Sequence, residues 1–176
     1  MMFVSNYRNT DIVQPFGPFS PKFTMSFAQD DKMLKKAVNG IVSDMSNRKL
    51  KDGEQLNMAG YSYGAVLQEY ATIELVKKGY KVDNLILIGS PTSDNSELMG
   101  TLKQYKKDGK IGNIIRYDIP GDKLSNPKNG IEFTEGIKQG ATEGDNAHHF
   151  DLARPGQQTD DKIKELGILL LKNGVK

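Results

Sequence analysis

Ser62 is the residue of this chain best placed to do covalent chemistry. It stands at the centre of Gly60-Tyr61-Ser62-Tyr63-Gly64, which fits the pattern G-x-S-x-G. In that pattern the serine occupies a sharp turn between a strand and a helix, and its Oγ is lifted clear of the sheet. The turn strains the backbone, and we expect a Cβ at Gly60 or Gly64 to crowd the strand against the helix. Ser62 is therefore the candidate nucleophile, at the positive end of the following helix.

A serine hydroxyl is a weak nucleophile and needs a general base, which in turn needs a group that holds and polarises it. The chain has two histidines, His148 and His149, which are adjacent in the sequence. Either can supply the base, and the other then has an unrelated surface or capping role.

The acid should stand at the carboxyl end of a strand between the serine and the histidines in the sequence. Asp118 stands at the end of such a strand, and Asp122 stands on the loop beyond it, placed by Pro120-Gly121. We favour Asp122, because a carboxylate on that loop can reach across to the histidine loop. Asp118 remains the alternative acid, with capping or salt bridging as its competing role.

An oxyanion formed at Ser62 needs two backbone N–H donors. The geometry of the turn assigns one of them to Tyr63. The second is expected from the loop after the first strand, where Ser5 and Asn6 lie, although no distinctive pattern marks it there.

Strands and helices alternate around these residues. Apolar runs predict strands before Ser62, over 82–89 and over 111–117, and helical spacing predicts a helix over 65–78. Asp94 and Glu97 resemble a capping box that opens another helix before the third strand. This order favours right-handed crossovers and a parallel sheet, and hence an α/β fold.

The flanking segments are less regular. Asp30 or Asp31 can cap a helix whose apolar stripe is Leu34, Ala37, Val38, Ile41 and Met45. Thr159 or Asp160 can cap a last helix whose buried side is Ile163, Leu166, Leu169 and Leu170. Between them, residues 131–134 and 136–139 are predicted to pair as a hairpin or to add one strand.

The N-terminal region predicts a short strand over residues 2–5 and then a loop over 6–29. This loop carries Phe16, Phe19, Phe23 and Phe27. The rings either anchor the loop by packing into the core or form the wall of a site for the acyl chain, and packing into the core is the favoured interpretation.

Composition excludes several classes of function. A length of 176 residues suits one domain, and 37% hydrophobic and 26% charged residues are ordinary for a soluble protein. A net charge of +2 with scattered lysines gives no argument for nucleic acid binding. The absence of cysteine excludes disulfides, thiolate catalysis and cysteine-ligated metal, and we expect no metal or cofactor.

These residues together resemble the serine lipase and esterase branch of the α/β-hydrolases. The resemblance rests on the G-x-S-x-G motif of residues 60–64, here called the elbow motif, on Ile88-Gly89-Ser90-Pro91, and on the order serine, acid, histidine. It covers roughly residues 55–155. His149 is favoured as the base, because its offset to the aliphatic Leu152 resembles a run common in lipases. The resemblance implies a three-layer fold with a reduced, mainly parallel sheet flanked by helices, over one domain of residues 1–176. It also implies hydrolysis of carboxylic esters, among them lipid or phospholipid esters.

Small hydrolases of this kind also occur as antibacterial effectors. The resemblance therefore implies an inhibitor protein or a secretion-system carrier as candidate partners, and transient contact with a membrane surface. The start of the chain lacks the pattern of a signal peptide. The protein is therefore expected either in the cytoplasm or as the C-terminal part of a longer exported chain. Two rivals stay open: an acyltransferase or thioesterase with the same serine, and a hydrolase-like binding module without turnover.

Overall fold

The computed structural model describes residues 32–47, 49–144, 147–154 and 156–176. The described part is an α/β structure with one sheet of three parallel strands in the order β1-β2-β3. The strands are β1 (Asn57–Tyr61), β2 (Val82–Ile88) and β3 (Ile111–Tyr117). The predicted α/β class and parallel sheet are thereby confirmed.

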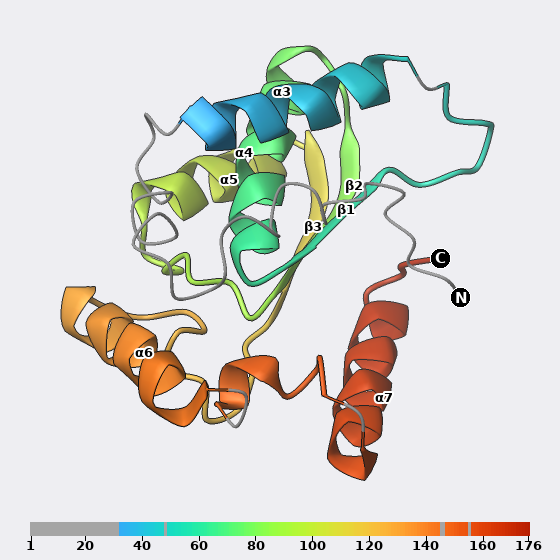
Figure 1. Cartoon of the computed structure of the whole chain (residues 1–176). Coiled ribbons are helices and arrows are strands. Elements are labelled where there is room, and N and C mark those ends of the chain that lie inside the picture. The colour runs from blue at the N-terminus through green and yellow to red at the C-terminus, as the bar shows by residue number, and fades with distance from the viewer. Residues whose placement is uncertain (1–31, 48, 145–146, 155) are drawn as a thin grey trace.

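Five α-helices and a short 3-10 turn accompany these strands in the described residues. They are α3 (Lys32–Ser46), α4 (Tyr63–Lys77), α5 (Glu97–Lys107), α6 (Gly130–Glu143), the turn η2 (His148–Phe150) and α7 (Gln157–Lys172). Figure 1 shows α3, α4 and α5 lying together beside the strands, with α6 and α7 away from these three helices.

The two faces of β2 serve two apolar clusters, as the alternation of side chains along a strand requires. Leu85 and Leu87 join the larger cluster with α3, α4 and α5, whereas Ile86 joins a smaller one with Leu170 and Val175. The central strand is therefore covered on both faces, which explains its continuous apolar sequence. Helices thus lie on both faces of the sheet.

Helix α4 lies at the centre of the larger cluster. Eleven of its fifteen residues are buried, so it presents no wide polar face. It contacts β1, β2, α3 and α5. The predicted stripe of α3 (Leu34, Ala37, Val38, Ile41 and Met45) is buried in the same cluster. The helix that follows Ser62 is consequently held by packing against two strands and two helices.

The prediction of strands over residues 131–134 and 136–139 is wrong, because this region is helix α6. The Asn129 side chain accepts hydrogen bonds from the backbone N–H groups of Ile131 and Glu132, which caps the helix. Gly136 and Gly140, four residues apart, form its buried side. Glycine propensity argued against a helix here, and tertiary packing against these small residues overrode it.

Two predicted helix starts are also wrong. Ser96, not Asp94, caps α5 by accepting from the Met99 N–H, while the Asp94 carboxylate binds Lys103. Helix α7 begins at Gln157, so Thr159 and Asp160 lie in its first turn. The Thr159 hydroxyl instead donates to the Asp151 carbonyl.

One predicted core position of α7 is wrong as well. Ile163 is 50% exposed, whereas Leu166, Leu169 and Leu170 pack toward the sheet. The predicted cap at Asp30 or Asp31 and the strand over residues 2–5 lie outside the described residues.

A row of three asparagines crosses the sheet. Asn57, Asn84 and Asn113 are in register on the three strands. The Asn84 side chain donates to Asn57 Oδ1 at 2.7 Å and accepts from Asn113 Nδ2 at 2.9 Å. Because Asn84 is buried, these bonds satisfy a polar group that would otherwise be costly to enclose.

We expect Asn84→Ala to lower the free energy of unfolding by about 1–3 kcal/mol, because it leaves the amides of Asn57 and Asn113 without their shared partner. Urea denaturation measures this change. Asn39→Ala on the exposed face of α3 is the control and should stay within about 0.5 kcal/mol of wild type. Equal effects of the two substitutions would contradict a stabilising role for the row.

Candidate active site

Ser62 lies in a strained turn between β1 and α4. Its backbone angles are φ 56° and ψ −129°, in a region that residues with a side chain rarely adopt. The turn is held by the Ser62 N–H, which donates to the Ile88 carbonyl at 2.8 Å, and by the Ala65 N–H, which donates to the Ser62 carbonyl at 2.9 Å. Such strain costs on the order of 1–3 kcal/mol and persists only where the surroundings enforce it.

Steric crowding requires a glycine at only one of the two glycine positions that flank Ser62 in the elbow motif. A Cβ at Gly60 would come within 2.3 Å of the Gly64 carbonyl oxygen, whereas a Cβ at Gly64 would meet no atom within 4 Å. The expectation that both glycines relieve crowding is thus wrong for Gly64. The strand residue faces the returning helix backbone, and the helix residue faces open space.

The turn brings Ser62 to one of the two histidines. Ser62 Oγ lies 2.6 Å from His149 Nε2, and His149 Nδ1 lies 2.7 Å from Asp122 Oδ2. His149 and Asp122 are buried, at 4% and 7% exposure, so water competes little for this pair. The three groups form one hydrogen-bonded line from hydroxyl to carboxylate.

The second oxygen of Asp122 fixes the direction of this line. Asp122 Oδ1 accepts the Leu124 N–H at 2.9 Å, which leaves Oδ2 for the imidazole. A carboxylate only accepts hydrogen bonds, so the proton of neutral His149 resides on Nδ1. Nε2 then presents its lone pair to the Ser62 hydroxyl, as a general base must.

The loop that carries His149 is held by a buried polar hub. Asp151 accepts hydrogen bonds from His148, Arg154 and Lys162, and Arg154 also donates to the Ala147 carbonyl at 2.6 Å. Burial raises the pKa of Asp151, but hydrogen bonds from Lys162 and His148 outweigh it and hold the pKa below its usual value. The hub therefore stays charged and fixes the η2 turn that contains His149.

Tyr61, the residue before the nucleophile, grips the same turn. Its hydroxyl donates to the His149 backbone carbonyl, and its ring stacks on the imidazole with centroids 5.7 Å apart and planes 19° apart. Burial, together with the negative charge of Asp122, raises the pKa of Tyr61, so its hydroxyl remains a donor. Tyr61 was not among the predicted site residues, although its place inside the motif put it beside the base.

The two rival residues have other partners. The Asp118 carboxylate binds Arg116 at 3.2 Å through one oxygen and Asn126 Nδ2 at 2.9 Å through the other. His148 has a side chain that is 47% exposed and binds Asp151. The geometry thus brings Ser62, Asp122 and His149 together and leaves Asp118 and His148 outside this line.

Helix α6 supports the loop that carries Asp122. A Cβ at Gly136 would come within 2.6 Å of the Leu124 backbone nitrogen, so the helix and the loop touch through backbone atoms. Gln139 adds hydrogen bonds to the Lys123 N–H at 3.3 Å and the Gly121 carbonyl at 3.4 Å. A helix that was predicted as strands is therefore part of the frame around the acid.

Of the three residues predicted to form the oxyanion hole, the structure describes one, Tyr63. Tyr63 is the first residue of α4, so its N–H belongs to the positive end of a helix that begins beside Ser62. Ser5 and Asn6 lie outside the described residues, as do Phe16, Phe19, Phe23 and Phe27.

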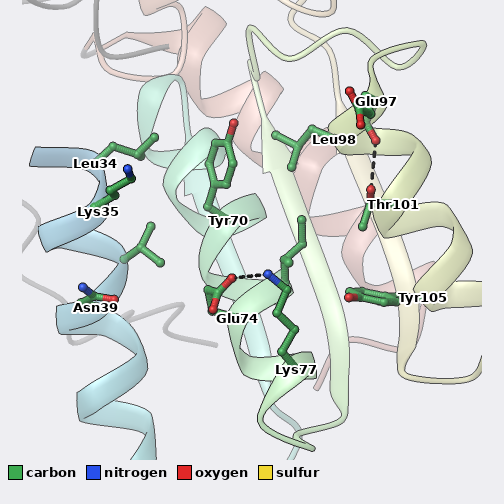
Figure 2. Close-up of a pocket in the computed structure, with 12 residues that line it drawn as sticks. Leu34, Lys35, Asn39, Tyr70, Glu74, Lys77, Glu97, Leu98, Thr101 and Tyr105 are labelled. Atoms are coloured by element: carbon green, nitrogen blue, oxygen red, sulfur yellow. Dashed lines mark hydrogen bonds and ion pairs between the residues drawn. The ribbon is translucent and has the colours of Figure 1, made fainter. Parts of the chain in front are cut away.

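A separate groove of about 600 Å³ lies between α3, α4 and α5. Figure 2 shows Leu34, Tyr70 and Leu98 around it, with the ion pair of Glu74 and Lys77. None of Ser62, His149 and Asp122 lines this groove.

Within the part of the chain that the structure describes, no group of acidic residues and histidines could hold a metal ion. Among the same residues, every helix is too short or too polar to span a membrane.

Comparison of the chain with protein-family models, with curated proteins and with solved structures finds no match.

We expect a fluorophosphonate probe to label wild-type protein at Ser62, because the probe reacts with a serine whose hydroxyl is activated by a base. Ser62→Ala should abolish labelling while leaving the melting temperature near that of wild type. Mass spectrometry of the labelled peptide identifies the site. Labelling that persists in Ser62→Ala would show that another residue is the nucleophile.

The acid can be assigned by the same probe. Asp122→Asn should slow labelling by at least a hundredfold, since an amide in place of the carboxylate favours the wrong imidazole tautomer. Asp118→Asn, the control, should change the rate less than threefold, because Asp118 binds Arg116 and Asn126. A larger loss in Asp118→Asn would reverse the assignment.

We expect Tyr61→Phe to slow labelling about tenfold, because it removes the hydrogen bond to the His149 carbonyl and keeps the stacked ring. Tyr117→Phe is the matched control, since its hydroxyl donates to the carboxylate of Glu165 at 3.2 Å. The observed rate constants at a fixed probe concentration measure both effects. Similar losses in the two variants would contradict a specific role for Tyr61.

Proposed function

We propose that this chain is a serine hydrolase that cleaves carboxylic esters through an acyl-enzyme intermediate on a small α/β-hydrolase-like fold. One observation carries the proposal. Ser62 Oγ, His149 and Asp122 are joined by contacts of 2.6 and 2.7 Å, with the serine on a strained strand-to-helix turn. That constellation is the chemical requirement for a serine nucleophile with a base and an acid that orients it.

The geometry supports a two-stage reaction. Ser62 Oγ attacks the ester carbonyl carbon as its proton passes to His149 Nε2, and the negative charge moves to the carbonyl oxygen. The tetrahedral intermediate collapses, the ester C–O bond breaks, and the alcohol leaves with the proton from His149. Water then attacks the acyl-Ser62 ester with His149 again as base, which releases the carboxylic acid and restores the serine.

Two features of this chain lower the barrier to these steps. Asp122 stabilises the imidazolium that forms when His149 takes the proton, and it does so from a buried position where the interaction is little screened. The N-terminal end of α4, at Tyr63, supplies a positive potential and one oxyanion donor beside the developing charge.

The fold supports the same reading. The nucleophile follows the carboxyl end of one parallel strand, the acid follows the carboxyl end of another, and the histidine comes later in the chain. This order of serine, acid and histidine is that of the α/β-hydrolases. The three-stranded sheet agrees with a reduced version of that fold.

The acyl group of the substrate and the molecule that accepts it from Ser62 are predicted from the resemblance to lipases and esterases alone. A lipid or phospholipid ester is the favoured substrate, with transient contact to a membrane surface and an inhibitor or carrier protein as further predicted partners. A triad activates other hydroxyl or thiol acceptors as it activates water, so transfer to an added alcohol should be measured beside hydrolysis. Product analysis by mass spectrometry separates an acyltransferase from a hydrolase.

We expect His149→Ala to lower the turnover of p-nitrophenyl esters by a factor on the order of a thousand or more, as loss of a triad member does. His148→Ala is the matched control and should stay within about threefold of wild type, because His148 does not contact Ser62 or Asp122 and Asp151 keeps its bonds to Arg154 and Lys162. Esters of two and twelve carbons in the acyl chain should be compared. Equal activity of His149→Ala and wild type would refute the proposal.

A further inference from the structure

Glu69 is a buried carboxylate to which the triad chemistry assigns no task. It lies on α4, two turns after Ser62, and its exposed fraction is 0%. Its two oxygens accept hydrogen bonds from Ser90 Oγ at 2.9 Å and Thr92 Oγ1 at 2.6 Å. Enclosing a carboxylate is costly, so a buried acid with defined partners is a candidate for a specific role.

Ser90 connects this carboxylate to the loop of the triad acid. Its carbonyl accepts the Asn126 N–H at 2.8 Å and Arg116 Nη2 at 3.4 Å. Asn126 is held at φ 58°, a left-handed conformation uncommon for residues other than glycine. Its side chain accepts from the Asp94 N–H at 2.8 Å and donates to Asp118 at 2.9 Å. Asn126 therefore joins the loop after β2 to the loop after β3.

The residue before Asn126, Ser125, closes the loop on which Asp122 stands. Ser125 donates its N–H to the Asp122 carbonyl at 3.2 Å and accepts the Ile119 N–H through Oγ at 3.1 Å. The Asp122 N–H donates to the Ile119 carbonyl at 3.0 Å. The path from Glu69 to Asp122 thus runs by hydrogen bonds to Ser90 and Asn126 and by the peptide bond from Asn126 to Ser125.

We propose that Glu69 is a positioning residue for the triad, which acts through Ser90 and Asn126 to fix the loop that carries Asp122. The inference deepens the proposed function and rests on it. With both carboxylate oxygens as acceptors, the hydroxyls of Ser90 and Thr92 are held as donors, and the start of the loop after β2 has one arrangement. A protonated Glu69 has a donor on one oxygen, so one of these two bonds must reverse.

The state of Glu69 depends on pH in the working range. Burial raises its pKa to about 7, against hydrogen bonds from Thr92 and Ser90 and the charge of Arg116, which is itself paired with Asp118. These are the polar and charged groups that face Glu69 from the loop after β2 and from β3. The site should therefore lose activity as the pH falls through about 7 and Glu69 becomes protonated.

Stability should change in the opposite direction. Because the pKa of Glu69 is higher in the folded state than its ordinary 4.5, its contribution to stability is greatest below pH 4.5 and is lost as the pH rises through 7. Glu69→Gln removes the buried charge and should melt no lower than wild type at pH 8. A loss of activity in that variant would then not come from a loss of folding.

The first experiment compares Glu69→Gln, Ser90→Ala and the double variant in ester hydrolysis at pH 8. We expect kcat to fall about tenfold in each single variant, KM to stay within twofold, and the double variant to lose no more than either single one. Glu74→Gln on the same helix is the control and should stay within twofold, since Glu74 pairs with Lys77 at the surface. Unchanged kcat in Glu69→Gln, or full additivity with Ser90→Ala, would overturn the proposal. If Glu69→Gln fails to fold, Ser90→Ala decides by the same criterion.

The pH profile supplies a second readout that a purely structural role would not move. In wild type log kcat/KM should fall by about one additional unit as the pH falls through 7 and Glu69 is protonated, and Glu69→Gln should lack this additional fall. Identical pH profiles in both proteins would overturn the proposal.

A third measurement separates this proposal from the proposed function. If wild type neither reacts with the fluorophosphonate nor hydrolyses esters, the proposed function fails, and the positioning can still be followed by the NMR signal of the His149 Nδ1 proton. The protein has only two histidines, so His148→Ala assigns that signal. The signal should shift or broaden in Glu69→Gln and stay unchanged in Glu74→Gln. An unchanged signal in Glu69→Gln would overturn the positioning role.

Discussion

The backbone at Ser62 is the constraint on which the arrangement of this protein depends. A residue with a side chain is held at φ 56° and ψ −129° where β1 ends and α4 begins. The strain is tolerated because both flanking elements are fixed: β1 by its pairing with β2, and α4 by burial between the sheet, α3 and α5. The apolar core thereby contributes to the geometry of the site, because it keeps Ser62 in its unusual backbone conformation.

The base and the acid are placed by polar contacts instead. Asp122 and His149 stand on segments after β3, where the larger apolar cluster does not extend. Asp151 with its three basic partners holds the histidine turn, and Asn126 with Ser125 holds the acid loop. Polar networks of this kind define one geometry only when their members are satisfied. The nucleophile is thus fixed mainly by packing and its partners mainly by hydrogen bonding.

This division has a consequence for stability. Glu69 lies inside the apolar part of the protein, where an ionised carboxylate costs free energy, yet its partners connect it to the polar part. Strained turns and buried charges lower stability at the place where geometry must be defined most closely. Such a compromise is typical of functional sites, which sacrifice some folding free energy for positioning.

Local sequence patterns determined much of this protein. The elbow motif, the three apolar strands, the α/β class and the apolar stripe of α3 could all be predicted, because each depends on residues close together in the chain. The position of Asp122 on a loop beyond the strand made it the favoured acid, and the resemblance to a lipase pattern made His149 the favoured base. Patterning alone could not exclude Asp118 and His148, since neighbouring residues share one sequence context and differ only in what they face.

The tertiary structure decided what depends on distant residues. Helix α6 forms in a glycine-containing segment because Gly136 packs on the backbone of Leu124. The Tyr61 hydroxyl donates to a carbonyl 88 residues away, and the Glu69 carboxylate accepts from Ser90, 21 residues away. Of the two glycines in the motif, only Gly60 faces backbone that comes too close for a side chain. Short-range patterns report periodicity and turn chemistry, whereas these choices depend on contacts that exist only after the chain has folded.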